Sequence, residues 1–269
     1  MASAGDVFDH GRHGTSLARV EQAKNTRCSA ASRVDADSQQ SPPKPLLVAA
    51  PCDAGEYPVV VFLHGYLCNN YFYSQLIQHV ASHGFIVVCP QLYTVSGPDT
   101  TGEINSAAAV IDWLAAGLSS KLAPGIRPNL AAVSISGHSR GGKVAFALGL
   151  GHAKTSLPLA ALIAVDPWTA PASGNQTPPP ILAYKPNAIR VPAPVMVIGT
   201  GLGELPRNAL FRPARRWGQP RGILRRVRGA GVPPRGQGLQ PHRHDGRRDD
   251  GRQGLATRAL CKTAGPGRP

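Results

Sequence analysis

The segment ISGHSRGGKVAFALGLG (135–151) constrains the fold most, because it places one serine at a glycine-lined turn between two unlike patterns. The apolar run that enters the turn is typical of a buried strand, and the run that leaves it has helical spacing. Ser139 occupies the centre of G-x-S-x-G, in which a sharp strand-to-helix turn lifts the hydroxyl clear of a sheet. The alternative is a plain glycine-rich connection, but the flanking strand and helix favour a nucleophile elbow.

Other apolar runs alternate with helical patterns along the same part of the chain. Runs typical of buried strands are YPVVVFLHG (57–65), FIVVCPQ (85–91), LAALIAVDP (159–167) and APVMVIGTG (193–201). Helical spacing of apolar residues predicts helices over 72–84, 104–118 and 142–151. Strands that are apolar throughout and separated by helices predict an α/β fold, with a mostly parallel, doubly wound sheet covered by helices.

Charge divides the chain into unlike parts. The whole sequence carries +14, from 29 Lys and Arg against 15 Asp and Glu, and residues 212–269 hold 15 of the basic residues and 3 of the acidic ones. The tail therefore contributes +12, and it has almost no apolar periodicity, so we expect a disordered basic region. We expect a largely irregular N-terminal extension over 1–44 and an incomplete catalytic domain over 45–211.

Two further features of a serine-hydrolase site lie outside the elbow serine itself. The backbone N–H groups of Tyr66 or Leu67, after the run 57–65, and of Arg140, directly after the serine, are expected to form an oxyanion hole. Asp166 ends the strand that follows the elbow helix, at the sheet edge where catalytic groups gather; the alternative is a turn aspartate before proline. His64 precedes the serine and is interpreted as a buried, loop-shaping residue rather than the base.

The runs LHGYLCNNYFYSQLIQHVASHGFIVVCPQ, GHSRGGKVAFALGLGHAKTSLPLAALIAVDP and IGTGLGELPRNALF resemble plant chlorophyllase, over about residues 46–211. The resemblance implies an α/β-hydrolase fold and cleavage of chlorophyll to chlorophyllide and phytol, with no cofactor. It also implies a Ser-Asp-His triad in which Ser139 and Asp166 match the first two members. The flat macrocycle and the phytyl chain need an apolar cleft, and Tyr71 and Phe72 are candidates to line it, with core or rim packing as the alternative.

The third member of the family's triad is a histidine in a segment like GH-x-DM(M/L)DD, after an acidic helix like EFFDEC, and neither segment is present. Both emerge from one shifted reading frame. ILRRV (223–227), encoded as ATT CTT CGA CGA GTG, reads Phe-Phe-Asp-Glu one base later, and QGLQPHRHDGRR (237–248) can likewise give Lys-Asp-Tyr-Ser-His-Thr-Asp-Met-Met-Asp-Asp. We therefore hypothesise that residues from Arg212 to about Asp250 are out of frame. A shift back is expected near 249–253, since GLATRALCK (254–262) again resembles the family.

The recovered histidine falls on the codons of Pro241 and His242. His242 is thus the candidate base, but it lacks the loop that would bring its imidazole within hydrogen-bond distance of the serine. Loss of a triad member leaves only the acceleration from binding and the oxyanion hole. We expect the chain as written to be severely impaired.

Two other functions remain open. One is a general lipase or esterase of the same fold, and the other is an inactive pseudoenzyme whose basic tail binds RNA or an anionic membrane. We do not expect nucleic acid, because the tail has a single aromatic residue, Trp217, to interleave with its charges. Five scattered cysteines without ligand spacing argue against a metal site.

The substrate implies the chloroplast and is compatible with peripheral contact with a membrane. The N-terminal segment is only a weak transit peptide, because acidic residues interrupt it, so the cytosol and the endomembrane system are the alternatives. The sequence does not define the oligomeric state.

Overall fold

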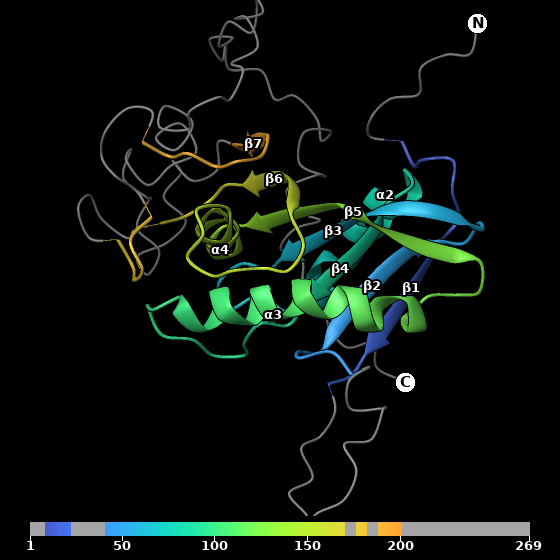
Figure 1. Ribbon diagram of the computed structural model, residues 1–269, viewed down its shortest axis with the longest axis horizontal. Coiled ribbons are helices and arrows are strands. Elements are labelled where there is room, and N and C mark those ends of the chain that lie inside the picture. The colour runs from blue at the N-terminus through green and yellow to red at the C-terminus, as the bar shows by residue number, and fades with distance from the viewer. Residues whose placement is uncertain (1–8, 23–40, 170–175, 182–187, 201–269) are drawn as a thin grey trace, which may run out of the picture.

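The computed structural model describes residues 9–22, 41–169, 176–181 and 188–200. Within these ranges seven strands form one sheet in the order β1-β2-β4-β3-β5-β6-β7 (Figure 1). The strands are β1 (Thr15–Val20), β2 (Leu46–Pro51), β3 (Gly55–Leu63), β4 (Ile86–Pro90), β5 (Ile126–His138), β6 (Leu159–Val165) and β7 (Val195–Ile198). The helices are η1 (Asn70–Tyr73), α2 (Ser74–Ser82), α3 (Thr101–Gly117), η2 (Leu118–Lys121) and α4 (Arg140–Gly149).

The sheet is parallel from β4 through β3, β5 and β6 to β7, and antiparallel where β2 meets β1 and β4. Helices α2, α3 and α4 connect the successive parallel strands from β3 to β6. This confirms the predicted α/β fold with a mostly parallel sheet. Parallel strands need such crossover connections, and the helices then shield both faces of the sheet from water.

The two faces of the sheet have separate hydrophobic cores. Alternation along β2 shows the division, since Leu46 and Val48 pack with α3 and α4 whereas Leu47 and Ala49 pack with α2. Successive strand side chains point to opposite faces, so a strand covered on both sides is apolar at every position. Figure 1 shows the same layers, with α3 and α4 together on one side of the sheet. The chain is therefore doubly wound in the region that holds the elbow.

The N-terminal segment contributes an edge strand that the sequence analysis did not predict. β1 pairs antiparallel with β2, from Thr15 opposite Pro51 to Val20 opposite Leu46. Four of its six side chains are exposed, so the strand is held by backbone hydrogen bonds and has no apolar alternation to reveal it. The expectation of a largely irregular extension is wrong for these residues.

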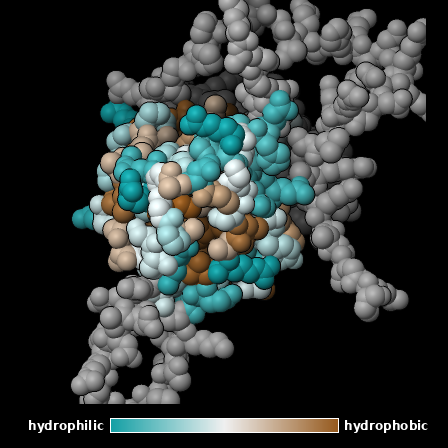
Figure 2. All heavy atoms as spheres, turned by 90° about the vertical axis from the view of Figure 1, so that its right-hand side faces the viewer, coloured by the Kyte–Doolittle hydropathy of each residue, from teal (hydrophilic) through white to brown (hydrophobic). Residues whose placement is uncertain are grey.

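The remaining surface of the described domain is mixed in polarity. Figure 2 shows a face on which hydrophobic residues lie interspersed with hydrophilic ones, as is common on protein surfaces. Among the helices of the described residues, none is long and apolar enough to span a bilayer. The basic tail, 212–269, lies outside the described residues, and the prediction made for it is untested.

Candidate active site

Ser139 lies in a strained turn between the end of β5 and the start of α4. Its φ of 53° and ψ of −115° are rare for a residue with a side chain, and such conformations cost about 1–3 kcal/mol unless the surroundings enforce them. A Cβ on Gly137 would lie 2.4 Å from the carbonyl of Gly141, and one on Gly141 would lie 2.3 Å from the carbonyl oxygen of Leu63. The glycines of the motif are thus required by close backbone contacts, which is the geometry predicted for a nucleophile elbow.

Asp166 lies beside this turn, at the end of the neighbouring strand. His138 pairs with Val165 across β5 and β6, so the residues that follow them, Ser139 and Asp166, leave adjacent strand ends. The Ser139 N–H donates to the carbonyl of Val165 at 2.9 Å, and the Trp168 N–H donates to the carbonyl of Ser139 at 3.0 Å. The structure therefore brings the two predicted catalytic residues to one edge of the sheet.

The Asp166 carboxylate is oriented by Thr200, which the sequence analysis missed. The Thr200 N–H donates to Oδ1 at 2.9 Å and the Thr200 hydroxyl donates to Oδ2. The Asp166 N–H donates to the carbonyl of Ile198 at 2.8 Å. The available signal was a threonine near the end of the predicted strand 193–201, at the same edge of the sheet. Both carboxylate oxygens are thus held at the end of β7.

The loop Gly65–Cys68 follows β3 and is called the oxyanion loop below. The Cys68 N–H donates to the carbonyl of Gly65 at 3.1 Å, and Leu67 has a positive φ of 54°. Tyr66 and Leu67 are 44% and 55% exposed. The loop therefore presents its backbone at the edge of the sheet that holds Ser139, but no contact tests the oxyanion hole, which stays a prediction.

His64 is buried beneath this loop, as interpreted from the sequence. Its Nδ1 lies 2.9 Å from the carbonyl oxygen of Gly65, and its Nε2 lies 3.0 Å from the backbone nitrogen of Leu92. An Nε2 that accepts from an N–H leaves the ring proton on Nδ1, which donates to Gly65. Burial lowers the pKa of His64, and backbone groups occupy both of its ring nitrogens, so the imidazole shapes the loop.

Tyr73 ties the oxyanion loop to the elbow. Its hydroxyl accepts from the Gly65 N–H at 3.0 Å and lies 2.8 Å from Nδ1 of His138. Burial raises the pKa of Tyr73, so the phenol keeps its proton, which we assign to the bond with His138. No sequence pattern indicates this contact, because Tyr73 lies within a helical pattern that is equally typical of core packing.

Tyr71 and Phe72 have different surroundings. The two rings meet edge to face, with centroids 4.6 Å apart, but Phe72 packs partly against the core beneath α2. Tyr71 is exposed and lines a hollow of about 250 Å³ near the start of β2, with Asn70 and Gln91 among the other lining residues. Ser139 does not line this hollow, so contact of Tyr71 and Phe72 with substrate stays a prediction.

The predicted base, His242, lies outside the described residues, as does the whole segment assigned to a shifted frame. In the part of the chain that is described, no cluster of three or more His, Cys, Asp or Glu side chains could hold a metal ion. The described residues thus supply a strained serine, an oriented carboxylate and a shaped loop.

A mostly parallel sheet with a serine elbow after β5 and an acid at the end of the neighbouring β6 defines an α/β-hydrolase. The sequence model of the family described as Chlorophyllase matches residues 3–220. The chain belongs to the chlorophyllase family. The match begins well before residue 46, where the resemblance was expected to start, and so includes β1.

The chain is similar to curated chlorophyllases and to a solved esterase structure. Chlorophyllase-2 of Arabidopsis thaliana is 47% identical over 216 residues, which is 79% of this chain and 67% of the relative. "Chlorophyllase-1, chloroplastic" of Citrus unshiu is 43% identical over 171 residues, 63% of this chain and 50% of the relative. The chain thus spans about half to two thirds of the length of these relatives. Esterase B of Lactobacillus rhamnosis is 19% identical, with a TM-score of 0.44 over 62% of this chain and 54% of the esterase.

Proposed function

We propose that this protein is a carboxylic-ester hydrolase that cleaves the phytyl ester of chlorophyll, giving chlorophyllide and phytol. The observation that carries the proposal is the strained Ser139 beside the oriented carboxylate of Asp166, in a chain of the chlorophyllase family. Relatives named chlorophyllase support the substrate. The chloroplastic relatives support the chloroplast as its location.

In this mechanism the Ser139 hydroxyl attacks the ester carbonyl while a histidine takes its proton. The Arg140 N–H and an N–H of the oxyanion loop stabilise the negative oxygen of the tetrahedral intermediate. The histidine then returns the proton to the phytol oxygen as the C–O bond breaks, and water releases chlorophyllide from the serine by the same steps in reverse roles. Asp166 holds the imidazole in the tautomer that these transfers need.

The histidine must come from the C-terminal segment, and there the proposal has two parts. The residues from 212 to about 250 are out of frame relative to the family, and the chain as written is therefore severely impaired. The end of the family match at residue 220 is consistent with a break soon after Phe211. In the restored frame a histidine on the codons of 241 and 242 would have the family's own loop to position it.

The test compares three proteins: the chain 1–269, its Ser139→Ala variant, and a chain translated in the restored frame. Release of chlorophyllide is measured from its partition away from phytol-bearing pigment. Hydrolysis of short p-nitrophenyl esters is assayed in parallel. We expect hydrolysis of chlorophyll by the frame-restored chain, and only a trace by 1–269. Cleavage of short esters without cleavage of chlorophyll by the restored chain would favour a general esterase. Near-normal chlorophyll hydrolysis by 1–269 would refute the claim of impairment.

A further inference from the structure

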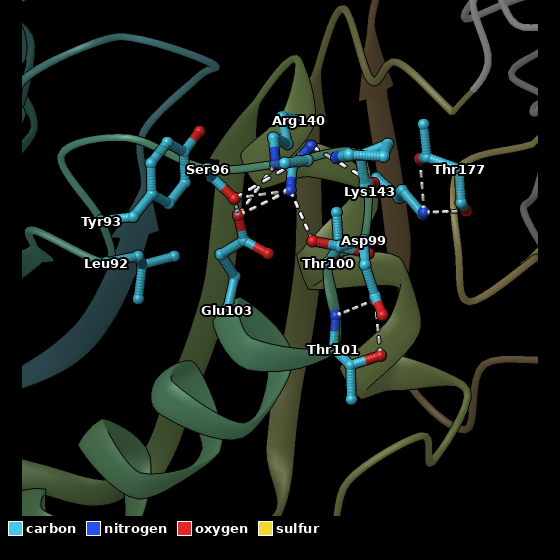
Figure 3. Close-up of polar contacts among 12 residues, drawn as sticks. Leu92, Tyr93, Ser96, Asp99, Thr100, Thr101, Glu103, Arg140, Lys143 and Thr177 are labelled. Atoms are coloured by element: carbon cyan, nitrogen blue, oxygen red, sulfur yellow. Dashed lines mark hydrogen bonds and ion pairs between the residues drawn. The ribbon is translucent and has the colours of Figure 1, made fainter.

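Arg140 is predicted to act through its backbone N–H, which assigns no role to its side chain. That side chain is buried. Only 3% of its surface is exposed, and the guanidinium lies against Glu103, near the first turn of α3 (Figure 3). Arg140 Nε and Nη2 donate to one oxygen of Glu103, Oε1, at 2.9 and 2.8 Å. This buried ion pair fixes the guanidinium against the start of α3.

The same guanidinium fixes the segment that leads from β4 to α3. Nη2 donates to the carbonyl of Asp99 at 2.8 Å and to Oγ of Ser96 at 3.0 Å. The Ser96 hydroxyl in turn donates to Oε1 of Glu103 at 2.7 Å. Arg140, Ser96 and Glu103 therefore form a closed network that ties the start of α4 to the start of α3 (Figure 3).

Two tyrosine rings flank the guanidinium. The Cζ atom of Arg140 lies 5.6 Å from the ring centroid of Tyr66 and 5.6 Å from that of Tyr93, distances at which a cation is attracted to an aromatic ring. Tyr66 belongs to the oxyanion loop. The Arg140 side chain thus contacts Tyr66, which lies on one side of the predicted oxyanion hole. The backbone N–H of Arg140 is predicted to donate from the other side.

The energetics argue against a purely stabilising role. Removing two charges from water is expensive, and replacement of a buried ion pair by apolar residues of similar volume is often neutral or stabilising. The presence of Arg140 and Glu103 at this buried position therefore needs an explanation other than stability. Their contacts indicate that the pair orients the groups around it. A guanidinium has a rigid planar set of donors, so it fixes direction as well as distance.

We propose that the Arg140–Glu103 pair is a positioning device that sets the separation and direction of the two oxyanion-hole donors. The inference rests on the proposed function, because it assigns a role within that same site. Tetrahedral intermediates gain from donors only when these lie at about 2.7–3.1 Å from the developing oxyanion. Loss of the pair should therefore lower kcat and leave KM nearly unchanged, since ground-state contacts do not depend on that alignment.

The assay does not require the missing base. A hydrolase that lacks part of its triad keeps about 10³–10⁴-fold acceleration over water, which comes from the oxyanion hole and binding. Residual hydrolysis of p-nitrophenyl butyrate by the full chain 1–269 therefore reports on the hole itself. The Ser139→Ala variant gives the rate that does not depend on the nucleophile.

We would compare Arg140→Lys, Glu103→Leu and Glu103→Gln, with Arg127→Lys as the matched control on an exposed part of β5. Arg140→Lys and Glu103→Leu should lower kcat by about tenfold or more with KM changed less than about twofold. Glu103→Gln keeps an oxygen acceptor for Nε and Nη2, so it should retain most of the wild-type kcat. Each rate is divided by the folded fraction from an unfolding curve, so loss of fold is not read as loss of alignment.

The outcomes separate the two hypotheses. The chain 1–269 and its Ser139→Ala variant should share the residual rate that the oxyanion hole and binding supply, so the proposed function is judged on the frame-restored chain. A restored chain whose rate equals that of its own Ser139→Ala variant overturns the proposed function and the inference with it. A restored chain that is faster than its Ser139→Ala variant, together with an unchanged kcat in Arg140→Lys and Glu103→Leu, overturns the inference alone. Equal losses in Glu103→Gln and Glu103→Leu also overturn it, because the acceptor geometry would then be irrelevant.

Discussion

Replacement of Tyr73 by phenylalanine tests whether one hydroxyl joins the oxyanion loop to the elbow. Tyr73 is 1% exposed, and its hydroxyl bonds to the Gly65 N–H at 3.0 Å and to His138 Nδ1 at 2.8 Å. Phenylalanine fills the same space, so the change removes two hydrogen bonds without leaving a large cavity. The effect can thus be assigned to the lost bonds.

The magnitude follows from burial. A buried N–H left without a partner costs about 1–3 kcal/mol, and the second bond adds about 1 kcal/mol. We expect Tyr73→Phe to lower the free energy of unfolding by about 2–4 kcal/mol, which corresponds to a fall in Tm of roughly 4–16 °C for a domain of this size. Denaturant unfolding measures the first quantity and a thermal scan the second.

The matched control is Tyr71→Phe, which removes a phenol from an exposed ring two residues away and should change stability by less than about 0.5 kcal/mol. Hydrogen exchange of the Gly65 amide provides a local readout, since this proton should exchange faster in Tyr73→Phe than in the wild type. Equal stability of the two variants, with unchanged exchange at Gly65, would refute the reasoning.

Two further substitutions probe the elbow and the buried cation beside it. Gly141→Ala places a Cβ 2.3 Å from the carbonyl oxygen of Leu63, so it should lower the free energy of unfolding by about 3 kcal/mol in denaturant unfolding. The control is Gly102→Ala, which has open space around its Cβ and should be neutral or stabilising. Equal effects of the two substitutions would contradict the steric argument. Lys143→Met removes bonds from Nζ to Thr177 Oγ1 at 2.7 Å and to the Pro178 carbonyl at 3.1 Å, which should cost about 2–3 kcal/mol at pH 7. Because burial lowers the pKa of Lys143 from 10.5 to about 8, the unfolded state binds more protons between these values. Wild-type stability should therefore rise relative to Lys143→Met as the pH increases from 8 to 10.5. A stability difference that stays constant over that range in denaturant titrations would contradict the assignment.

The parts of the fold that could be predicted from the sequence are those in which a residue's neighbours along the chain determine its environment. β4 was expected over 85–91 and spans Ile86–Pro90, all of it buried, because a strand buried on both faces must be apolar at each position. β1 could not be found this way, since its pairing with β2 depends on backbone groups that every residue carries. The short strand β2 was likewise not singled out from the linker that precedes it.

The sequence predicts candidate site residues that belong to a motif, and it misses residues whose contacts come from distant parts of the chain. Ser139 and Asp166 were found because each ends or follows a recognisable strand. Thr200 and Tyr73 were missed because their importance arises from contacts across 34 and 65 residues of chain. Arg140 was predicted only for its backbone, since no local pattern indicates that its side chain pairs with Glu103, 37 residues away.

Backbone strain gives an argument for the site that does not depend on sequence resemblance. Among the described residues, the non-glycine positions with positive φ are Leu67, Ser139 and Asp166, at 54°, 53° and 41°. They follow three different strands, β3, β5 and β6, which are neighbours in the sheet. Such conformations persist only where surrounding structure enforces them, and they cluster where strain serves a function.

Contacts among the described residues help to enforce these conformations. Gly141 packs against the carbonyl of Leu63, and the backbone of Ser139 is bonded to Val165 and Trp168. The described residues thus hold the serine, the acid and the oxyanion loop in these strained conformations. If the C-terminal frame alone separates this chain from an active hydrolase, restoring that frame should suffice to recover activity, because the strained half of the site is already in place.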